Sequence, residues 1–125
     1  MNYELTQRFH FDAAHTLRRD IDTESSRRIH GHTYTAEVTI AGQPDPATGM
    51  LLDLGHLRKE VEGVRQRLDH RLLDEVQGLQ AATLEGLCSF LWAELSVVFP
   101  GLSRIVVGRD ASGDRCSLQR ERSLV

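Results

Sequence analysis

Residues 30–41 read HGHTYTAEVTIA, and they contain the most informative local pattern in the sequence. Threonine, valine, tyrosine and isoleucine dominate it, and these residue types favour a β-strand. Side chains alternate along a strand with a period of two, so His30 and His32 point to the same face, with only a glycine between them. The sequence therefore predicts a strand that begins with two neighbouring imidazoles.

The segments around this strand extend it into a sheet. Residues 2–12 alternate loosely between polar and apolar side chains, which predicts an upstream partner strand. A polar, charged stretch over residues 16–28 has no apolar period and is interpreted as a surface loop that joins the two strands. Residues 103–107 and 115–120 predict two further strands, joined by a turn.

Two helices are expected between these pairs of strands. After an N-cap at Asp53, apolar residues recur at steps of three and four, and a second helical period begins at Thr83. The resulting order predicts a single α+β domain over residues 1–125, with an antiparallel sheet and both helices on one face. The uncovered sheet edges favour association with further copies of the chain.

Composition excludes several classes of protein. The 125 residues carry 15 Lys+Arg against 18 Asp+Glu, a net charge of −3 that gives no reason to expect nucleic-acid binding. No apolar run is long enough to span a membrane, and no signal peptide is recognisable, so we expect a cytoplasmic protein without a membrane partner. Two cysteines, Cys88 and Cys116, are too few for a disulfide scaffold and are expected to be buried.

Six histidines against two cysteines suggest that any metal is bound by imidazole. His15 ends the first predicted strand, and antiparallel pairing would bring it beside His30 and His32. Three neutral imidazoles with an open fourth position form a typical catalytic zinc site. On spacing alone, three ordinary surface histidines explain the pattern equally well.

Asp69-His70 follows the first helix directly. A carboxylate beside an imidazole can orient it and stabilise its protonated form, as a proton relay requires. A plain helix cap, with the imidazole favoured by the helix dipole, is the simpler interpretation of these two residues. Arg27 and Arg28 end the charged loop and either receive a polyanionic substrate or are simply solvated.

Four segments, in this order and spacing, resemble the 6-pyruvoyl-tetrahydropterin synthase family, and especially its bacterial 6-carboxy-tetrahydropterin synthase branch. They are FHFDAAH (9–15), IHGHTY (29–34), DPATGMLLDLGHLRKEV (45–61) and LDHRLLDE (68–75). The resemblance implies the T-fold: a four-stranded antiparallel sheet with two helices on one face, three copies of which close into a barrel. Two such rings usually stack, so a homotrimer or homohexamer is expected.

The resemblance also implies a zinc-dependent lyase acting on 7,8-dihydroneopterin triphosphate. Zn²⁺ would be held by His15, His30 and His32, and Asp69 with His70 would form the proton relay. In the bacterial branch the side chain is cleaved to leave a 6-carboxy group, and the product enters the synthesis of queuosine and other deazapurines.

Two departures from the family pattern affect the residues around the metal. Ser26 stands where the bacterial branch has its catalytic cysteine, and a serine hydroxyl needs activation to act as a base. The nearest carboxylate, Glu24, is a hypothetical replacement, as in members that release 6-hydroxymethyl-dihydropterin. In the third strand the family's pterin-anchoring glutamate is missing, and Asp110 is the closest carboxylate.

Three hypotheses follow from these observations. The first is a 6-carboxy-tetrahydropterin synthase-like lyase. The second is cleavage of the same substrate to 6-hydroxymethyl-dihydropterin, with Glu24 as the base. The third is a zinc-loaded T-fold protein that binds a pterin or purine-like ligand without turnover.

Overall fold

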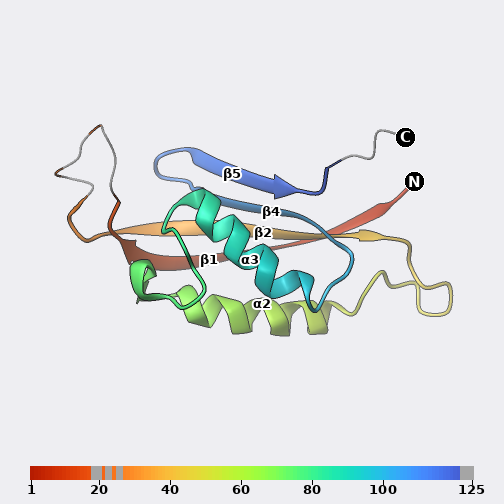
Figure 1. The fold of residues 1–125 in the computed structure, drawn as a ribbon. Coiled ribbons are helices and arrows are strands. Elements are labelled where there is room, and N and C mark those ends of the chain that lie inside the picture. Colours follow the sequence, from red (N-terminus) through yellow and green to blue (C-terminus); the bar gives the residue numbers. More distant parts are fainter. Residues whose placement is uncertain (18–20, 22–23, 25–26, 122–125) are drawn as a thin grey trace.

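Within the described residues, 1–17, 21, 24 and 27–121 of the computed structural model, the chain forms a five-stranded sheet with two α-helices on one face (Figure 1). The helices are α2 (Leu54–Leu68) and α3 (Leu84–Ser96), with a short 3₁₀ helix, η1, over Leu73–Glu75. The strands are β1 (Tyr3–His15), β2 (His30–Gly42), β3 (Arg71–Leu72), β4 (Leu102–Arg109) and β5 (Asp114–Gln119). The α+β class with two helices is therefore confirmed.

The two long strands β1 and β2 pair antiparallel along their whole length, from Tyr3 opposite Gly42 to His15 opposite His30. β1 extends as far as His15, because the alternation of buried and exposed side chains continues through Phe11 and Ala13. The register thus brings the end of the first strand beside the start of the second, as predicted.

The remaining strands complete the sheet in the order β3-β1-β2-β4-β5. β4 pairs antiparallel with β2, and β5 pairs antiparallel with β4. The sequence predicts four strands, and the structure adds β3, which pairs parallel with β1 at Ala13 and Ala14. A two-residue strand is too short to produce a recognisable period, which is why the sequence does not reveal it.

Both α-helices begin at the residues expected from their capping chemistry. The Asp53 carboxylate accepts a hydrogen bond of 2.8 Å from the backbone N–H of Gly55. The Thr83 hydroxyl accepts one of 3.0 Å from the N–H of Gly86. Each bond satisfies a backbone donor that the first helical turn leaves free.

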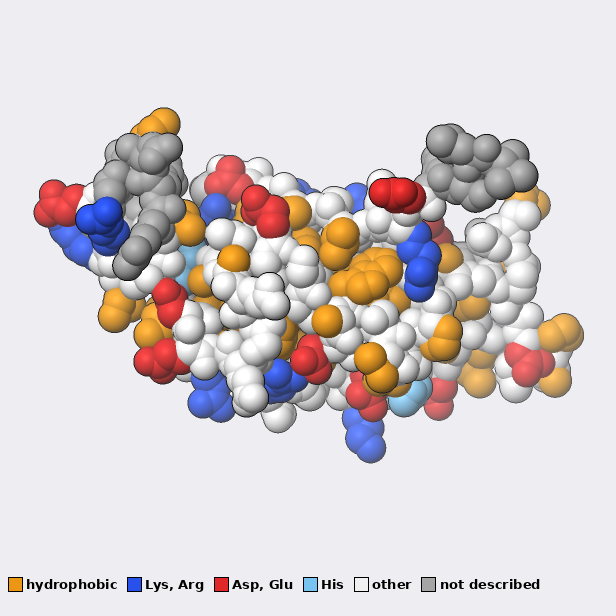
Figure 2. Space-filling model, in the orientation of Figure 1, with side chains coloured by type: hydrophobic (Ala, Val, Ile, Leu, Met, Phe, Trp, Pro, Cys, Tyr) orange, Lys and Arg blue, Asp and Glu red, His pale blue; other side chains and the backbone are white. Residues whose placement is uncertain are grey.

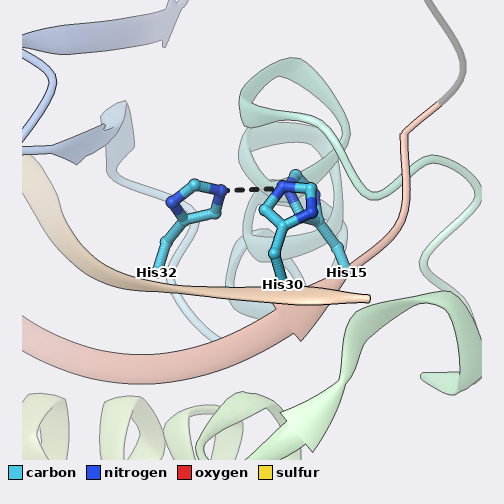
Figure 3. A group of neighbouring side chains, drawn as sticks. All are labelled: His15, His30 and His32. Atoms are coloured by element: carbon cyan, nitrogen blue, oxygen red, sulfur yellow. Dashed lines mark hydrogen bonds between the residues drawn. The ribbon is translucent and has the colours of Figure 1, made fainter. Parts of the chain in front are cut away.

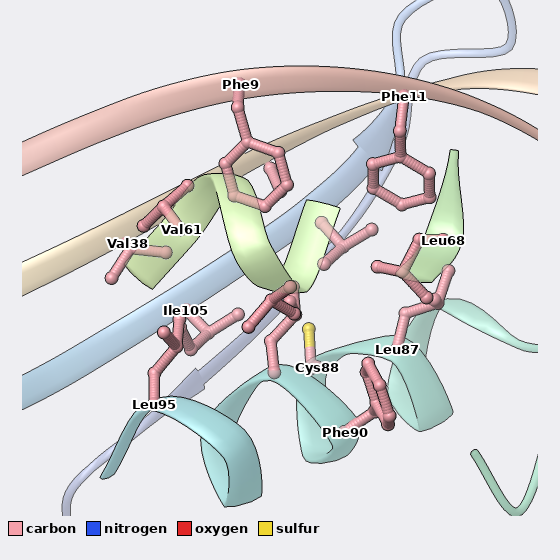
Figure 4. Packing of buried hydrophobic residues seen from close by; sticks show 14 of the residues in the cluster. Phe9, Phe11, Val38, Val61, Leu68, Leu87, Cys88, Phe90, Leu95 and Ile105 are labelled. Carbon is pink, nitrogen blue, oxygen red and sulfur yellow. The ribbon is translucent and has the colours of Figure 1, made fainter. Parts of the chain in front are cut away.

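The core lies between the helices and the sheet face that carries the odd-numbered residues of β1 (Figure 4). Phe9 points from β1 toward α2 near Val61, and Phe11 points toward Leu68 of α2 and Leu87 of α3. The ring of Phe11 stacks on that of Tyr34 at 5.0 Å between centroids. Burial of these apolar groups holds both helices against the sheet.

The opposite side of the sheet, here called the helix-free face, is polar. It carries Arg8, His10 and Asp12 of β1 opposite Glu37, Thr35 and Thr33 of β2. The outer edge of β1 before its contact with β3 has no strand partner among the described residues, and neither has the outer edge of β5. Free edges of this kind are sites where strands of another chain can pair.

On the side of the molecule that carries α2 and α3, hydrophobic side chains are mixed with charged ones (Figure 2). Among the described residues, no helix has the length and apolar character needed to cross a membrane. Cys88 is buried, and its thiol lies 3.4 Å from the backbone oxygen of Cys116, which is itself half-buried. Both thiols are free.

Candidate metal centre

Three imidazoles from β1 and β2 converge at one end of the sheet (Figure 3). The Nε2 atom of His15 lies 2.9 Å from Nε2 of His30 and 3.1 Å from Nε2 of His32. The sheet register produces this cluster, because His15 is the direct partner of His30 and the strand period places His32 on the same face. The structure therefore brings the three predicted ligands together.

Backbone carbonyls orient two of these rings. Nδ1 of His15 lies 2.6 Å from the carbonyl oxygen of Ala82, and Nδ1 of His30 lies 2.8 Å from that of Arg28. A carbonyl only accepts hydrogen bonds, so each Nδ1 carries the proton and each Nε2 of a neutral ring presents a lone pair. Two lone pairs 2.9 Å apart repel each other unless a cation lies between them. The donor set thus fits a metal ion, with the outer hydrogen bonds typical of metal-binding histidines.

Burial favours the neutral form of two of these imidazoles, His15 and His32. Burial lowers the pKa of His15, although its hydrogen bond to Ala82 opposes the shift. Burial and then the nearby Arg109 guanidinium lower the pKa of His32 to about 4. Neutral imidazole is the form that binds a metal, so at neutral pH these side chains are in the ligating state.

Arg109, at the end of β4, lies beside the histidine cluster. Its Nη1 atom is 3.4 Å from Nε2 of His32, and its Nη2 atom is 3.3 Å from the carboxylate of Asp114. The Nε atom of Arg109 is buried and has no hydrogen-bond partner among the described residues. The sequence does not point to this arginine, because 77 residues separate it from His32.

The chain directly after His15 is fixed by Asp74 of η1. The backbone N–H of Thr16 donates a hydrogen bond of 2.9 Å to this carboxylate, and the Thr16 hydroxyl donates one of 2.5 Å. Desolvation opposes the charged form of Asp74, but these hydrogen bonds lower the pKa of the carboxyl overall. Asp74 therefore stays ionised and holds the end of β1 in place.

Asp69 and His70 form the expected carboxylate–imidazole pair, with 2.9 Å between Asp69 Oδ2 and His70 Nδ1. The backbone N–H of Asp12 donates to Asp69, and Arg65 contacts the same carboxylate at 3.3 Å. The Asp12 hydrogen bond is the main reason that the pKa of Asp69 is lowered, and the His70 and Arg65 contacts add to it. Asp69 is thus a fixed anion beside an exposed imidazole.

His70 has a φ of 59°, the left-handed conformation that non-glycine residues rarely adopt. Its backbone N–H donates a hydrogen bond of 2.6 Å to the carbonyl oxygen of Asp12. This bond ends α2 with a sharp turn and leads the chain into β3. Backbone strain at a position that carries an exposed imidazole is typical of functional sites.

The Asp69–His70 pair and the three histidines are associated with different faces of the sheet within one chain. Asp12, Asp69 and His70 form a second cluster, in which the possible metal-binding atoms of the three side chains lie close together. The Thr33 hydroxyl donates a hydrogen bond to the Asp12 carboxylate of this cluster. Thr33 follows His32 directly, so the strand period turns these two side chains to opposite faces. An open pocket of about 530 Å³ is lined by residues of both clusters, including His32 and His70.

The structure places the other predicted site residues around this end of the sheet. The carboxylate of Asp110 accepts a hydrogen bond from Thr35 on the helix-free face, whereas the neighbouring Arg109 is the β4 residue beside the histidines. Glu24 is exposed and pairs with Arg28 at 3.0 Å. Arg27 is exposed as well, and Ser26 lies outside the described residues.

Comparisons with known proteins match nearly the whole chain to one family. Residues 4–121 match the family described as 6-pyruvoyl tetrahydropterin synthase. The chain is 32% identical over 111 residues to the 6-pyruvoyl tetrahydrobiopterin synthase of Homo sapiens, covering 78% of this chain and 77% of that protein. It is 31% identical over 105 residues to the 6-carboxy-5,6,7,8-tetrahydropterin synthase of Synechocystis sp., covering 79% and 80%.

A third relative carries a different activity in its name. The dihydroneopterin monophosphate aldolase of Pyrococcus furiosus is 31% identical over 101 residues, covering 81% of this chain and 82% of that protein. Among solved structures, the 6-pyruvoyl tetrahydropterin synthase of Caenorhabditis elegans shares the fold with a TM-score of 0.81 at 23% identity, covering 97% of both chains. A Plasmodium vivax synthase, solved as a variant of a catalytic glutamate, shares it with a TM-score of 0.73 at 15% identity, covering 98% and 99%.

Proposed function

Because the chain belongs to the 6-pyruvoyl tetrahydropterin synthase family, we propose that it is a zinc-dependent lyase acting on 7,8-dihydroneopterin triphosphate, with 6-carboxy-tetrahydropterin as the product. The observation that carries this proposal is the convergence of three Nε2 atoms, two of them on rings held by backbone carbonyls. His15, His30 and His32 would hold the zinc ion. When bound, zinc supplies a Lewis acid that polarises the side-chain oxygens of the substrate.

The proton transfers are assigned to the Asp69–His70 pair. Asp69 is already ionised and hydrogen-bonded, so it stabilises the imidazolium that forms when His70 takes up a proton. The exposed ring of His70 can then return the proton to the side chain of the substrate. The left-handed backbone at His70 supports this role, because backbone strain of this kind is typical of functional sites.

We assign the complete active site to the contact between two copies of the chain. His70 and the metal centre lie on different faces of one subunit, so a neighbouring copy is the natural source of the proton relay. The outer edges of β5 and of β1 before β3, which lack strand partners within the described part of the chain, support edge-to-edge pairing into a closed homotrimer or homohexamer. Asp110, on the helix-free face, would anchor the pterin ring of the substrate across the same contact.

The missing thiol supports a second candidate function. Cleavage to 6-hydroxymethyl-dihydropterin would use Glu24 as the base, and the aldolase name of the Pyrococcus furiosus relative favours this outcome. The Glu24 carboxylate is exposed and paired with Arg28, and Arg27 and Arg28 would receive the phosphates of the substrate. If Ser26 and Glu24 both fail as bases, the protein binds a pterin or purine-like ligand without turnover.

Product analysis separates these functions. Zinc-loaded protein is incubated with 7,8-dihydroneopterin triphosphate, and the products are identified by mass spectrometry. Acetaldehyde with 6-carboxy-tetrahydropterin supports the first function, and 6-hydroxymethyl-dihydropterin supports the second. The matched variants are Glu24→Gln, which should abolish turnover only in the second case, and His56→Ala, a histidine of α2 that should leave turnover unchanged. Recovery of unchanged substrate from zinc-loaded protein would exclude both enzymatic functions.

A further inference from the structure

The arginine beside the metal centre is unusual for a site that holds a divalent cation. Arg109 is only 22% exposed, and its guanidinium is fixed on one side by Asp114, whose carboxylate also accepts a hydrogen bond of 2.8 Å from Ser112. On its other side it contacts His32. A metal ion on the three histidines would thus lie close to a permanent positive charge in a partly buried site, and the two would repel.

The contacts of Arg109 change when the histidines bind a metal. Arginine only donates hydrogen bonds, so its 3.4 Å contact with Nε2 of His32 uses the lone pair that a metal would take. In the metal-loaded state Nη1 therefore loses its acceptor, and the buried Nε already lacks one among the described residues. Buried donors without acceptors are costly, so the loaded site needs an acceptor at this position.

We propose that Arg109 is a substrate-positioning residue that binds an anionic oxygen, from a carboxylate or a phosphate, on a ligand at the open position of the metal. An oxyanion there offsets the repulsion between the two cations and accepts hydrogen bonds from Nη1 and Nε. The fork of donors in a guanidinium matches both carboxylate and phosphate oxygens. The inference rests on the metal assignment within the proposed function, and not on a pterin substrate.

Arg109 also constrains what the ligand presents to the metal centre. The amino and ring N–H groups of a pterin are donors and cannot pair with a guanidinium. Within one chain, these N–H groups therefore do not face Arg109, and an oxygen acceptor of the ligand takes that place. Asp110, whose carboxylate lies on the helix-free face, remains available for those donors.

Anion binding to cobalt-loaded protein tests this inference without any turnover. Co²⁺ replaces Zn²⁺ in imidazole sites, and its visible absorption responds to a change of ligand. We would titrate wild type, Arg109→Met and Arg115→Met with acetate, with inorganic phosphate and with uncharged imidazole, at constant ionic strength. Arg115 is the matched control, because it is a β5 arginine that pairs with Glu37 on the helix-free face.

The expected result is a loss of about ten-fold or more in affinity for acetate or phosphate in Arg109→Met, as for a charge-assisted hydrogen-bonded pair. Imidazole should bind equally well to all three proteins, and Arg115→Met should behave as wild type. The anion whose affinity falls more identifies the ligand group as carboxylate or phosphate. Arg109→Lys keeps the charge without the fork, so its affinity should lie between those of wild type and Arg109→Met.

Two results would overturn the inference. Anion affinities in Arg109→Met that equal those of wild type would mean that Arg109 binds no oxyanion. Weaker cobalt binding in Arg109→Met would mean that the arginine supports His32 structurally, whereas relief of repulsion predicts cobalt binding at least as tight as in wild type. A protein that turns over no pterin but shows the Arg109-dependent anion effect would contradict the proposed function and leave this inference standing.

Discussion

The side chain of His15 is tied to the backbone of Ala82 across 2.6 Å, which connects the end of β1 to the loop before α3. This loop is held close to the helix by a glycine. A Cβ atom at Gly86 would lie 1.9 Å from the carbonyl oxygen of Ala81, so only glycine permits the approach. The orientation of the His15 ring thus depends on a carbonyl group 67 positions further along the chain.

We predict that Gly86→Ala destabilises the protein by about 2 kcal/mol or more, because the loop must move to relieve the overlap. Zinc affinity should fall as well, since the loop carries the carbonyl that orients His15. Urea unfolding and zinc titration measure the two effects. The matched control is Gly63→Ala in α2, where a Cβ meets open space and should add about 0.5–1 kcal/mol of stability. Equal effects of the two substitutions on stability and zinc affinity would contradict the role given to Gly86.

His70 offers a way to separate the imidazole from the backbone turn. His70→Gly relieves the strain at a φ of 59° and should leave the free energy of unfolding unchanged or raise it by up to about 1 kcal/mol. The same substitution should abolish turnover if His70 is the proton relay. His70→Val, a β-branched residue in a left-handed conformation, should lower stability by about 1 kcal/mol or more. Urea denaturation and product analysis check both outcomes, and an active His70→Gly protein would contradict the relay.

The hydrogen bonds and charges around the Asp69 carboxylate predict that the stability of the protein depends on pH. The pKa of Asp69 is lower in the folded state than in the unfolded chain, so its contribution is present above the unfolded pKa of about 3.9 and is lost as the pH falls through the folded pKa. Wild type should therefore be more stable than Asp69→Asn near pH 7, and the difference should shrink below about pH 4. Urea unfolding at a series of pH values measures it.

The control for this series is Glu121→Gln, which removes an exposed carboxylate. Its unfolding free energy should follow that of wild type at every pH. A difference between wild type and Asp69→Asn that stays constant from neutral to acidic pH would show that the carboxylate gains nothing from its charge.

Metal binding should be visible as thermal stability. A ligand that binds only the folded state stabilises it by about 2.7 kcal/mol at a hundred-fold excess over its Kd. Zinc should therefore raise the melting temperature of chelator-treated wild type and leave that of His30→Ala nearly unchanged. His56→Ala should respond to zinc like wild type, although it loses the ring contact with Phe99. A zinc response that His30→Ala retains in full would mean that the metal binds elsewhere.

The convergence of the three histidines could be predicted from the sequence, because it depends only on the geometry of paired strands. The two-residue period places His30 and His32 on one face, and antiparallel pairing of adjacent strands brings His15 beside them. The helix starts at Asp53 and Thr83 were predictable for a similar reason, since capping is decided by residues close in sequence.

The surroundings of the metal could not be predicted, because they depend on register between distant segments. A shift of one residue along a strand exchanges the two faces of the sheet, and this decides that Arg109 rather than Asp110 lies beside His32. The hydrogen bond from the backbone N–H of Asp12 to the Asp69 carboxylate likewise requires the turn after α2, which brings Asp69 against the edge of β1.

The proposed function depends above all on His15, His30 and His32 together holding a zinc ion. X-ray absorption at the zinc edge, combined with metal analysis of the purified protein, tests it most directly. We predict one tightly bound zinc per chain, coordinated by three imidazole nitrogens at about 2.0–2.1 Å and by a fourth light atom. A sulfur ligand, fewer than three imidazoles, or one tight zinc per chain retained in His30→Ala would contradict the account.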